Sequence, residues 1–198
     1  MDYHKLITGG QQNQFSPRQI ARQLYFLAPS YAFQHHRDLQ LELYEEISEH
    51  LDVALSAINL IGSGHTGFSL IKGTDFSKEN SDLDVAIVDS RLFLELFEQS
   101  FETTNGWNHT NLFPGDKPVK QQENRRQFLR YIGKGIIRPD LMPNSPERAS
   151  WTNFFGKLAW KYQDFCNGIS AGIYASETFM AAKQERAIEH YLATKGKV

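Results

Sequence analysis

The first quarter of the chain has the apolar spacing of amphipathic helices. Apolar residues recur every three or four positions between residues 39 and 51, which predicts a helix there. An earlier helix is predicted to begin at Ser16 and Pro17, because serine caps a first turn and the fixed φ of proline suits the first helical position. Residues 1–15 are polar and rich in Gln and Asn, and we expect a flexible lead-in there.

Two short apolar runs come next. Residues 56–61 (SAINLI) end in Gly-Ser-Gly, which is typical of a buried strand that turns into a tight loop. Residues 83–88 (LDVAIV) predict a second strand, and residues 90–102 predict an amphipathic helix. Residues 103–124 are rich in Asn, Gly, Pro and Lys, and are expected to form a long loop of the kind that often has a function.

The second half is expected to be mainly helical. Residues 123–133 predict a helix with a basic face, and residues 134–143 (KGIIRPDLMP) a short strand closed by proline. From Ser145 onward we expect two helices separated near Asn167 and Gly168. This order predicts an α/β core, a small mixed sheet flanked by helices with helical segments at both ends. The expected single domain, 1–198, divides into the lead-in 1–15, N-terminal helices 16–55, a catalytic sheet core 56–143 and a helical tail 145–198.

Composition places few limits on function. The 198 residues are 40% apolar and 22% charged, as in an ordinary globular domain, and the net charge of −2 gives no general attraction to nucleic acid or acidic membranes. Cys166 is the only cysteine, which excludes an intrachain disulfide, and it is expected to be a packing residue. No apolar run reaches membrane-spanning length and the first residues lack a signal-peptide pattern, so we expect a cytoplasmic protein without a membrane partner.

Asp82 and Asp84 precede and enter the second predicted strand. Residues two apart on a strand share a face, so both carboxylates point the same way while Leu83 points the other way. Adjacent carboxylates repel each other, and a divalent cation between them relieves the repulsion. The pair is therefore a candidate metal site. Aspartate after a turn is also a common way to begin a strand, which explains the spacing without any ligand.

The surrounding sequence narrows the alternatives for this pair. A calcium loop begun at Asn80 would need glycine and glutamate where the chain has Val85 and Arg91. In phosphatases and glycosyltransferases with such a pair the apolar strand comes before the aspartates, whereas here it follows. Gly62 and Ser63 follow the first strand and offer backbone N–H groups and a hydroxyl, which suit a polyphosphate. Together the two elements predict a site for a nucleoside triphosphate (NTP).

The stretches GSGHTGFS (62–69) and SDLDVAIV (81–88) resemble the signature of the DNA polymerase β-like nucleotidyltransferase superfamily. That signature is a Gly-Ser motif followed by an aspartate pair that leads an apolar strand. The family uses a third carboxylate on a neighbouring strand. In its branch of cyclic-dinucleotide and oligoadenylate synthases, that aspartate often precedes an aliphatic pair and a proline, and RPDLMP is similar, which nominates Asp140.

The resemblance implies a two-metal reaction. Asp82, Asp84 and Asp140 would be catalytic and would hold two Mg²⁺ or Mn²⁺ ions, with Asp140 helping to activate the acceptor hydroxyl. One ion lowers the pKa of that hydroxyl and the other neutralises the departing pyrophosphate.

The resemblance also implies where the nucleotide binds. Gly62 and Ser63 would hold the triphosphate, and Ser81 beside the aspartate pair is a further nucleotide-binding candidate. In the family a lysine from the helical part beyond the sheet often contacts the triphosphate, which nominates Lys157 or Lys161. Surface lysines beside core aromatic residues have the same appearance.

Other residues near these motifs have two interpretations. The gap between Ser63 and Asp82 predicts an inserted loop, in which His65, Thr66 and Ser69 either reach phosphates or face solvent. The basic residues of segment 117–138 either attract a triphosphate or an RNA end, or form a solvated helix face. The histidines lack zinc-ligand spacing.

These features predict an enzyme that transfers NMP from an NTP such as ATP to a hydroxyl of a protein, an RNA or a small molecule. Fewer than sixty residues follow Asp140, which favours a minimal nucleotidyltransferase over the alternative, a synthase of cyclic or linear oligonucleotide signals. A second alternative is a nucleotide-binding regulatory module without turnover. The resemblance further implies a toxin–antitoxin or anti-phage context, with an antitoxin or defence-system partner.

Overall fold

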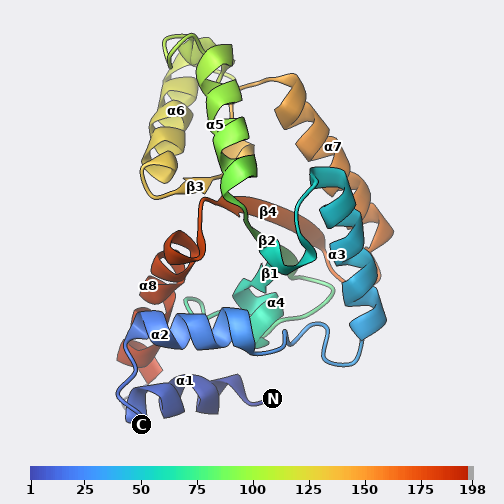
Figure 1. Ribbon diagram of the computed structural model, residues 1–198, viewed down its shortest axis with the longest axis vertical. Helices are drawn as coiled ribbons and strands as arrows, with labels where there is room; N and C mark the ends of the chain where they lie inside the picture. The colour runs from blue at the N-terminus through green and yellow to red at the C-terminus, as the bar shows by residue number, and fades with distance from the viewer. Residues whose placement is uncertain (196–198) are drawn as a thin grey trace.

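The computed structural model describes residues 1–195 and contains one four-stranded mixed sheet with helices around it (Figure 1). The strands are β1 (Ile58–Ile61), β2 (Asp82–Val88), β3 (Ile136–Ile137) and β4 (Gly168–Tyr174). Their order in the sheet is β1-β2-β4-β3, with β2 and β4 parallel and the two outer pairs antiparallel. The predicted α/β class, a small mixed sheet flanked by helices, is confirmed.

Three of the α-helices precede β1, and the others lie between the strands or follow β4. The α-helices are α1 (Tyr3–Gln12), α2 (Pro17–Arg22), α3 (Arg37–Leu51), α4 (Gly62–Thr66), α5 (Ser90–Thr103), α6 (Pro118–Ile132), α7 (Pro146–Lys161) and α8 (Glu177–Lys195). Short helical turns are η1 (Gln23–Leu27), η2 (Leu55–Ala57), η3 (Thr110–Leu112) and η4 (Pro139–Leu141). The expected long loop after α5 is shorter than predicted, because Pro118 begins α6.

The strand β2 has the alternation that the sequence predicts. Leu83, Val85 and Ile87 are buried in a core with α3, α5, α6 and α7. Asp82 and Asp84 occupy the alternate positions and point to the opposite face, where the strand's N-terminal part is open to solvent. Since β1 and β4 pair with β2 on either side, the aspartate pair lies on an interior strand of the sheet.

The segment expected to join two C-terminal helices is the strand β4, so the prediction of a purely helical tail was wrong. β4 pairs with β2 over its full length, from Gly168 opposite Asp82 to Tyr174 opposite Val88. Its apolar residues Ile169 and Ile173 alternate with small residues, which is a weak period-two signal. Glycine, serine and alanine have little strand preference of their own, and the pairing with neighbouring strands decides the structure.

Residues 1–15 contain α1, so the prediction of a flexible lead-in was also wrong. Asp2 caps this helix by accepting a hydrogen bond from the Lys5 N–H at 3.1 Å. Tyr3 and Ile7 lie one turn apart and are buried, with 3% and 0% of their surface exposed. The Tyr3 hydroxyl also donates to the Pro29 carbonyl at 2.5 Å. These apolar contacts order a segment whose overall composition is polar.

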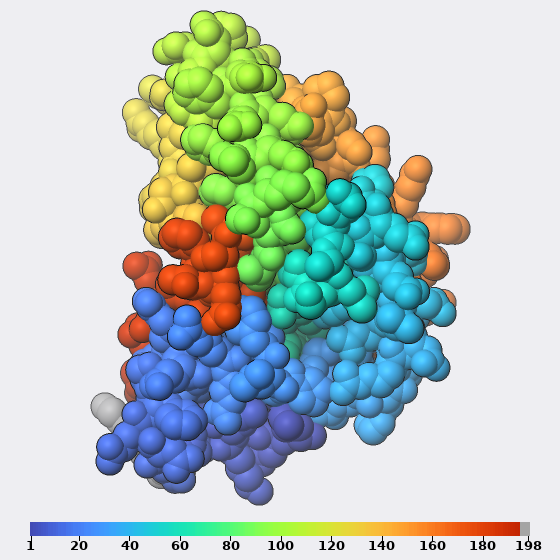
Figure 2. All heavy atoms as spheres, viewed as in Figure 1, coloured from blue at the N-terminus to red at the C-terminus, as the bar shows by residue number. Residues whose placement is uncertain are grey.

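The helices α1 and α2 lie beside the C-terminal helix α8 (Figures 1 and 2). The predicted start of α2 is confirmed, because the Ser16 hydroxyl accepts from the Gln19 N–H and the Gln19 side chain accepts from the Ser16 N–H. Arg18 on α2 pairs with Glu185 on α8 at 2.8 Å. The apolar contacts of α1, α2 and α8 form a second core, which covers part of the sheet face that carries the aspartates.

Cys166 is 1% exposed, and burial raises the pKa of its thiol to about 11, so the prediction of a packing residue is confirmed.

Within residues 1–195, no helix combines the length and the apolar composition needed to cross a membrane.

Truncation of Ile173 to alanine tests whether β4 belongs to the core. Ile173 is fully buried between the pairings to β2 and β3, so we expect the free energy of unfolding to fall by about 2–5 kcal/mol. Val119→Ala is the control, because Val119 is 79% exposed, and it should change stability by less than about 0.5 kcal/mol. Denaturant unfolding of both variants gives the comparison, and equal stabilities would contradict the placement of β4.

Candidate functional site

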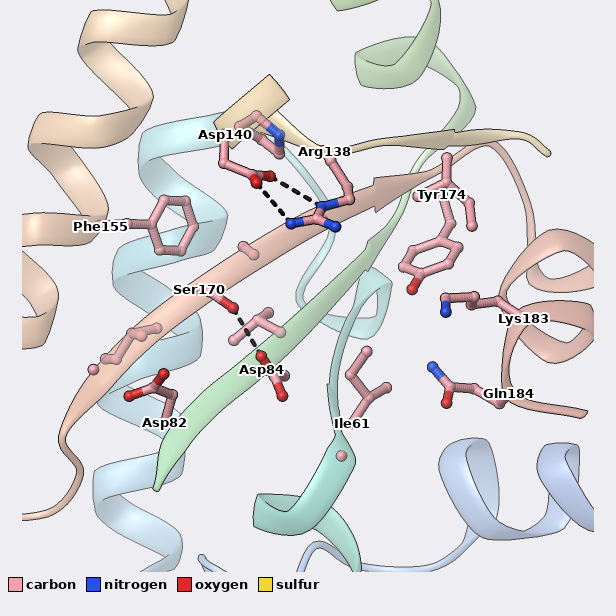
Figure 3. A pocket seen from close by; sticks show the side chains of 18 of the residues that line it. Ile61, Asp82, Asp84, Arg138, Asp140, Phe155, Ser170, Tyr174, Lys183 and Gln184 are labelled. Atoms are coloured by element: carbon pink, nitrogen blue, oxygen red, sulfur yellow. Dashed lines mark hydrogen bonds and ion pairs between the residues drawn. The ribbon is translucent and has the colours of Figure 1, made fainter. Parts of the chain in front are cut away.

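A cavity of about 860 Å³ lies over the sheet face that carries Asp82 and Asp84 (Figure 3). Residues of β1, β2 and β4 line it, as do residues 136–140, α7 and α8. It therefore combines parts of the chain that are far apart in sequence. Its size is within the range of roughly 300–1,000 Å³ that is usual for small-molecule sites.

Each aspartate is oriented by a neighbour from the β4 side. The Ser170 hydroxyl donates to Asp84 Oδ1 at 2.8 Å, and the Asn167 side-chain amide donates to Asp82 Oδ1 at 3.2 Å. Gly168 pairs with Asp82, and a Cβ there would lie 2.9 Å from Asp82 Oδ1. In the described part of the chain, the second oxygen of each carboxylate accepts no hydrogen bond and is available to a ligand.

The two carboxylates are electrostatically unfavourable together. Desolvation raises the pKa of Asp84, and the nearby charge of Asp82 raises it further, while the Ser170 hydrogen bond and the charges of Lys72 and Arg138 act in the opposite direction. The net effect is an increase in the pKa. A divalent cation bound to both side chains would remove this penalty, since its charge compensates both carboxylates.

Gly62 joins β1 to α4 directly beside Asp84. Its φ of +65° is in the left-handed region, and Ile61, the residue before it, pairs with Asp84 across the sheet. A Cβ at Gly62 would lie 2.8 Å from Asp84 Oδ2. Glycine thus keeps the space around the unbonded carboxylate oxygen open. Ser63 is the second residue of the same short helix and does not line the cavity.

Gly62→Ala is expected to disturb both the backbone and the carboxylate. The left-handed φ alone should lower stability by roughly 1–2 kcal/mol, and the added methyl group should displace Asp84 and weaken Mn²⁺ binding. Gly9→Ala is the control, since a Cβ at Gly9 meets nothing within 4 Å. Denaturant unfolding and a Mn²⁺ titration of both variants measure the effects. Unchanged metal affinity in Gly62→Ala would contradict this account of Gly62.

Asp140 lines the same cavity but does not join the aspartate pair. It lies in η4, after β3, and β4 separates β3 from β2, so Asp140 is not on a strand adjacent to the pair. Its carboxylate forms a bidentate ion pair with Arg138, with N–O distances of 3.1 and 2.6 Å (Figure 3). Residues 1–195 contain no cluster of three potential metal-binding side chains, and the neighbouring-strand position opposite Asp84 is Ser170.

The nominated lysines and Ser81 lie outside the cavity lining. Lys161 pairs with Glu46 on α3 at 2.7 Å, and Lys157 is exposed. The Ser81 hydroxyl accepts from the Ser77 N–H at 3.1 Å and closes the turn before β2. Lys157 and Lys161 were nominated as triphosphate contacts because they lie on a helix beyond the sheet. In the structure, α7 presents other residues to the cavity, including Thr152 and Phe155.

His65, Thr66 and Ser69 were expected either to reach phosphates or to face solvent, and the first two do not face solvent. His65 and Thr66 are 3% and 2% exposed. Thr66 donates to the Phe68 carbonyl at 2.5 Å, and Ser69 lines the cavity. His65 and Thr66 are buried because α4 packs against β1 and β2, which places these residues inside the fold.

Cationic and aromatic residues that the sequence did not single out as a group form the rest of the lining. Arg138 lies above the aspartate pair in Figure 3, and Lys183 on α8 lies across the cavity from Phe155. Arg186 on α8 and Tyr131 on α6 complete this side. A hydrogen bond from Arg138 lowers the pKa of Tyr131. Lys183 and Arg186 lie three residues apart on α8. In the sequence this spacing indicates only that they share a helix face, and it does not point to a ligand.

Comparison of the chain with protein-family models, with curated proteins and with solved structures found no match. Functional inference therefore depends on the geometry of the cavity and on the residues that line it.

Proposed function

We propose that the chain is a metal-dependent nucleotidyltransferase that moves NMP from an NTP to a hydroxyl acceptor. The main support is the aspartate pair on one face of β2, with Gly62 beside it, at the floor of a cavity that also contains Arg138 and Lys183. An acidic floor suits a divalent cation, and cations across the cavity suit the phosphates that such a cation accompanies.

The residues present fit a divalent cation. Asp82 and Asp84 each have one carboxylate oxygen that accepts no hydrogen bond from residues 1–195, and Gly62 and Gly168 leave space around the carboxylates. Mg²⁺ is often held by one or two carboxylates together with substrate phosphates, which matches this donor set. When bound, the metal would lower the pKa of the attacking hydroxyl and neutralise the departing pyrophosphate.

The protein side chains would position the reactants. Ser170 holds Asp84 through Oδ1, which leaves Oδ2 toward the space that Gly62 keeps open. Lys183 and Arg186 lie on the exposed side of α8 and would attract the triphosphate. Phe155 and Trp151 form an apolar wall on α7 that would exclude water from the opposite side of the cavity.

A nucleotide-binding module without turnover is the second candidate. The position adjacent to Asp84 on the neighbouring strand holds Ser170, where the resembled family uses a carboxylate, and Asp140 is engaged by Arg138. Both observations favour binding over catalysis. They do not affect the metal and nucleotide contacts on which the first candidate depends.

Incubation with each labelled NTP and Mg²⁺ or Mn²⁺ separates the candidates. Pyrophosphate release with label on a protein, an RNA or a small molecule supports nucleotidyl transfer, and a phosphatase-resistant small product supports an oligonucleotide synthase. Saturable metal-dependent NTP binding without pyrophosphate release supports the second candidate. Absence of both binding and turnover would contradict the assignment of this cavity to nucleotides.

A further inference from the structure

A second cavity, of about 430 Å³, lies at the outer edge of β1 and has no role in the proposed reaction. Within the described residues β1 pairs only with β2, and its other edge faces this cavity. Segment 25–30 and one side of α3 form the remaining walls, and His65 reaches it from α4. Tyr25 lines both cavities, which places the second site directly behind the first.

Two buried polar side chains line this cavity without a partner. Ser30 and His65 are 4% and 3% exposed, and neither Ser30 Oγ nor His65 Nδ1 forms a hydrogen bond with the described residues. Leaving a buried polar group unpaired costs about 1–3 kcal/mol. Native proteins leave few such groups, and a bound ligand is one way in which they become satisfied.

The state of the His65 ring determines what it can bind. Its Nε2 is 2.7 Å from the Leu24 carbonyl, which only accepts, so Nε2 carries the proton. Burial lowers the pKa of His65 to about 4, although the Leu24 and Leu60 carbonyls near the ring act in the opposite direction, so the ring is neutral near pH 7. Nδ1 is therefore a hydrogen-bond acceptor, and a ligand must present an O–H or N–H group to it.

The other end of the cavity is cationic. Arg37 at the start of α3 is exposed, and its contact in the described chain is a hydrogen bond from Nη1 to the Gln40 side chain at 3.0 Å. No carboxylate within residues 1–195 lies within salt-bridge distance of Arg37. A guanidinium has the planar pair of donors that a carboxylate accepts.

The walls are fixed by the backbone, so the cavity does not require a ligand to form. The Tyr31 N–H donates to the His65 carbonyl at 2.8 Å, and the Ala32 N–H donates to the Gly64 carbonyl at 2.9 Å. These bonds hold the segment that carries Ser30 against α4. Small-molecule sites are usually preformed in this way.

We propose that this cavity binds a small carboxylic acid that also carries a hydroxyl or amino group. The carboxylate would pair with Arg37 at the mouth, and the hydroxyl or amino group would donate to His65 Nδ1 beside the Ser30 hydroxyl. Because Tyr25 and α4 adjoin both cavities, occupancy would stabilise the segment that carries Gly62.

Binding of glycolate, L-lactate and L-serine to the full chain, followed by isothermal titration calorimetry and by chemical shifts, tests the proposal. We expect saturable binding of at least one of them, weaker binding of acetate, which lacks the donor, and shifts at Ser30 and His65. Absence of binding for all three at millimolar concentration, or acetate binding as tightly as the best of them, would overturn the proposal. A cavity occupied by water alone gives the first of these results.

Variants locate the binding and separate it from the nucleotide site. Arg37→Gln should weaken the affinity at least about tenfold, a change of about 1.4 kcal/mol, and Ser30→Ala should weaken it severalfold. Arg126→Gln, at another exposed arginine, is the control and should bind normally. Asp82→Asn combined with Asp84→Asn should also bind the acid normally, so failure of the proposed NTP function leaves this test intact. Unchanged affinity in Arg37→Gln would overturn the assignment.

Discussion

Replacement of both Asp82 and Asp84 by asparagine is expected to abolish metal-dependent NTP turnover, with a loss on the order of a thousandfold or more, about 4 kcal/mol of transition-state stabilisation. Asparagine keeps the size of each side chain and the hydrogen bonds to Asn167 and Ser170, but it carries no charge for a cation. Pyrophosphate release with Mg²⁺ measures the loss. Turnover at the wild-type rate would remove the aspartate pair from the mechanism.

The same double variant should fold at least as stably as the wild-type chain in the absence of metal. The pKa of Asp84 is raised above its unfolded value, so its charged form is disfavoured in the folded state. This penalty is fully present above the folded pKa, is relieved as the pH falls from the folded pKa toward the unfolded pKa, and is absent below the unfolded pKa. Removing the charge should therefore raise stability near pH 7, whereas a loss of folding would be a structural effect.

Addition of Mg²⁺ should make the wild-type chain more stable than the Asp82→Asn, Asp84→Asn double variant. The wild-type chain should gain thermal stability with metal, because binding to the native state stabilises it, while the double variant should not respond. Asp116→Asn is the matched control, since Asp116 is exposed and lies in the loop before α6, and it should respond to Mg²⁺ like the wild type. Thermal unfolding of the three proteins with and without Mg²⁺ gives the comparison.

The sequence predicted the elements in which local pattern and tertiary packing agree. β2 was predicted from its short apolar run, and the start of α2 from Ser16 as a capping residue and Pro17 at the first helical position, where the structure has both. β4 was missed because its glycine, serine and alanine residues carry little strand preference, and only pairing with β2 reveals the strand. The order of α1 likewise comes from contacts of Tyr3 and Ile7 with distant residues.

The residues of the candidate site fall into the same two groups, those predicted from local sequence and those that depend on the tertiary structure. Asp84 and Gly62 are near one another because β1 and β2 form an antiparallel pair in which Ile61 lies opposite Asp84. The sequence predicted that these two motifs share a site, but it did not predict the pairing of the strands. The remaining residues depend on the strand order. Since β4 is inserted between β2 and β3, Ser170 occupies the position beside Asp84, and Asp140 lies beyond it with Arg138. Spacing along the chain contains no information about that insertion.

Acidification from about pH 6.5 to about pH 4 is expected to destabilise the fold by about 3 kcal/mol through His65 alone. Burial lowers its pKa from the ordinary value of 6.5 to about 4, so the unfolded chain binds a proton at a higher pH than the folded chain does. The stability contributed by the neutral ring is complete above pH 6.5 and is lost as the pH falls. The rings of Tyr3 and Tyr25 and the carbonyls of Leu24 and Leu60 lie around it, and no carboxylate in the described chain forms an ion pair with it.

His65→Gln should remove this pH dependence, because glutamine can still donate to the Leu24 carbonyl but does not titrate. The variant will lose some stability at pH 7 through altered packing, so the informative quantity is the slope of unfolding free energy against pH and not its absolute value. His109→Gln, at an exposed histidine, should retain the wild-type slope. Denaturant unfolding at a series of pH values measures all three slopes. If His65→Gln and the wild type lose stability equally between pH 6.5 and 4, then the fold does not lower the pKa of His65, and the destabilisation at low pH comes from other groups.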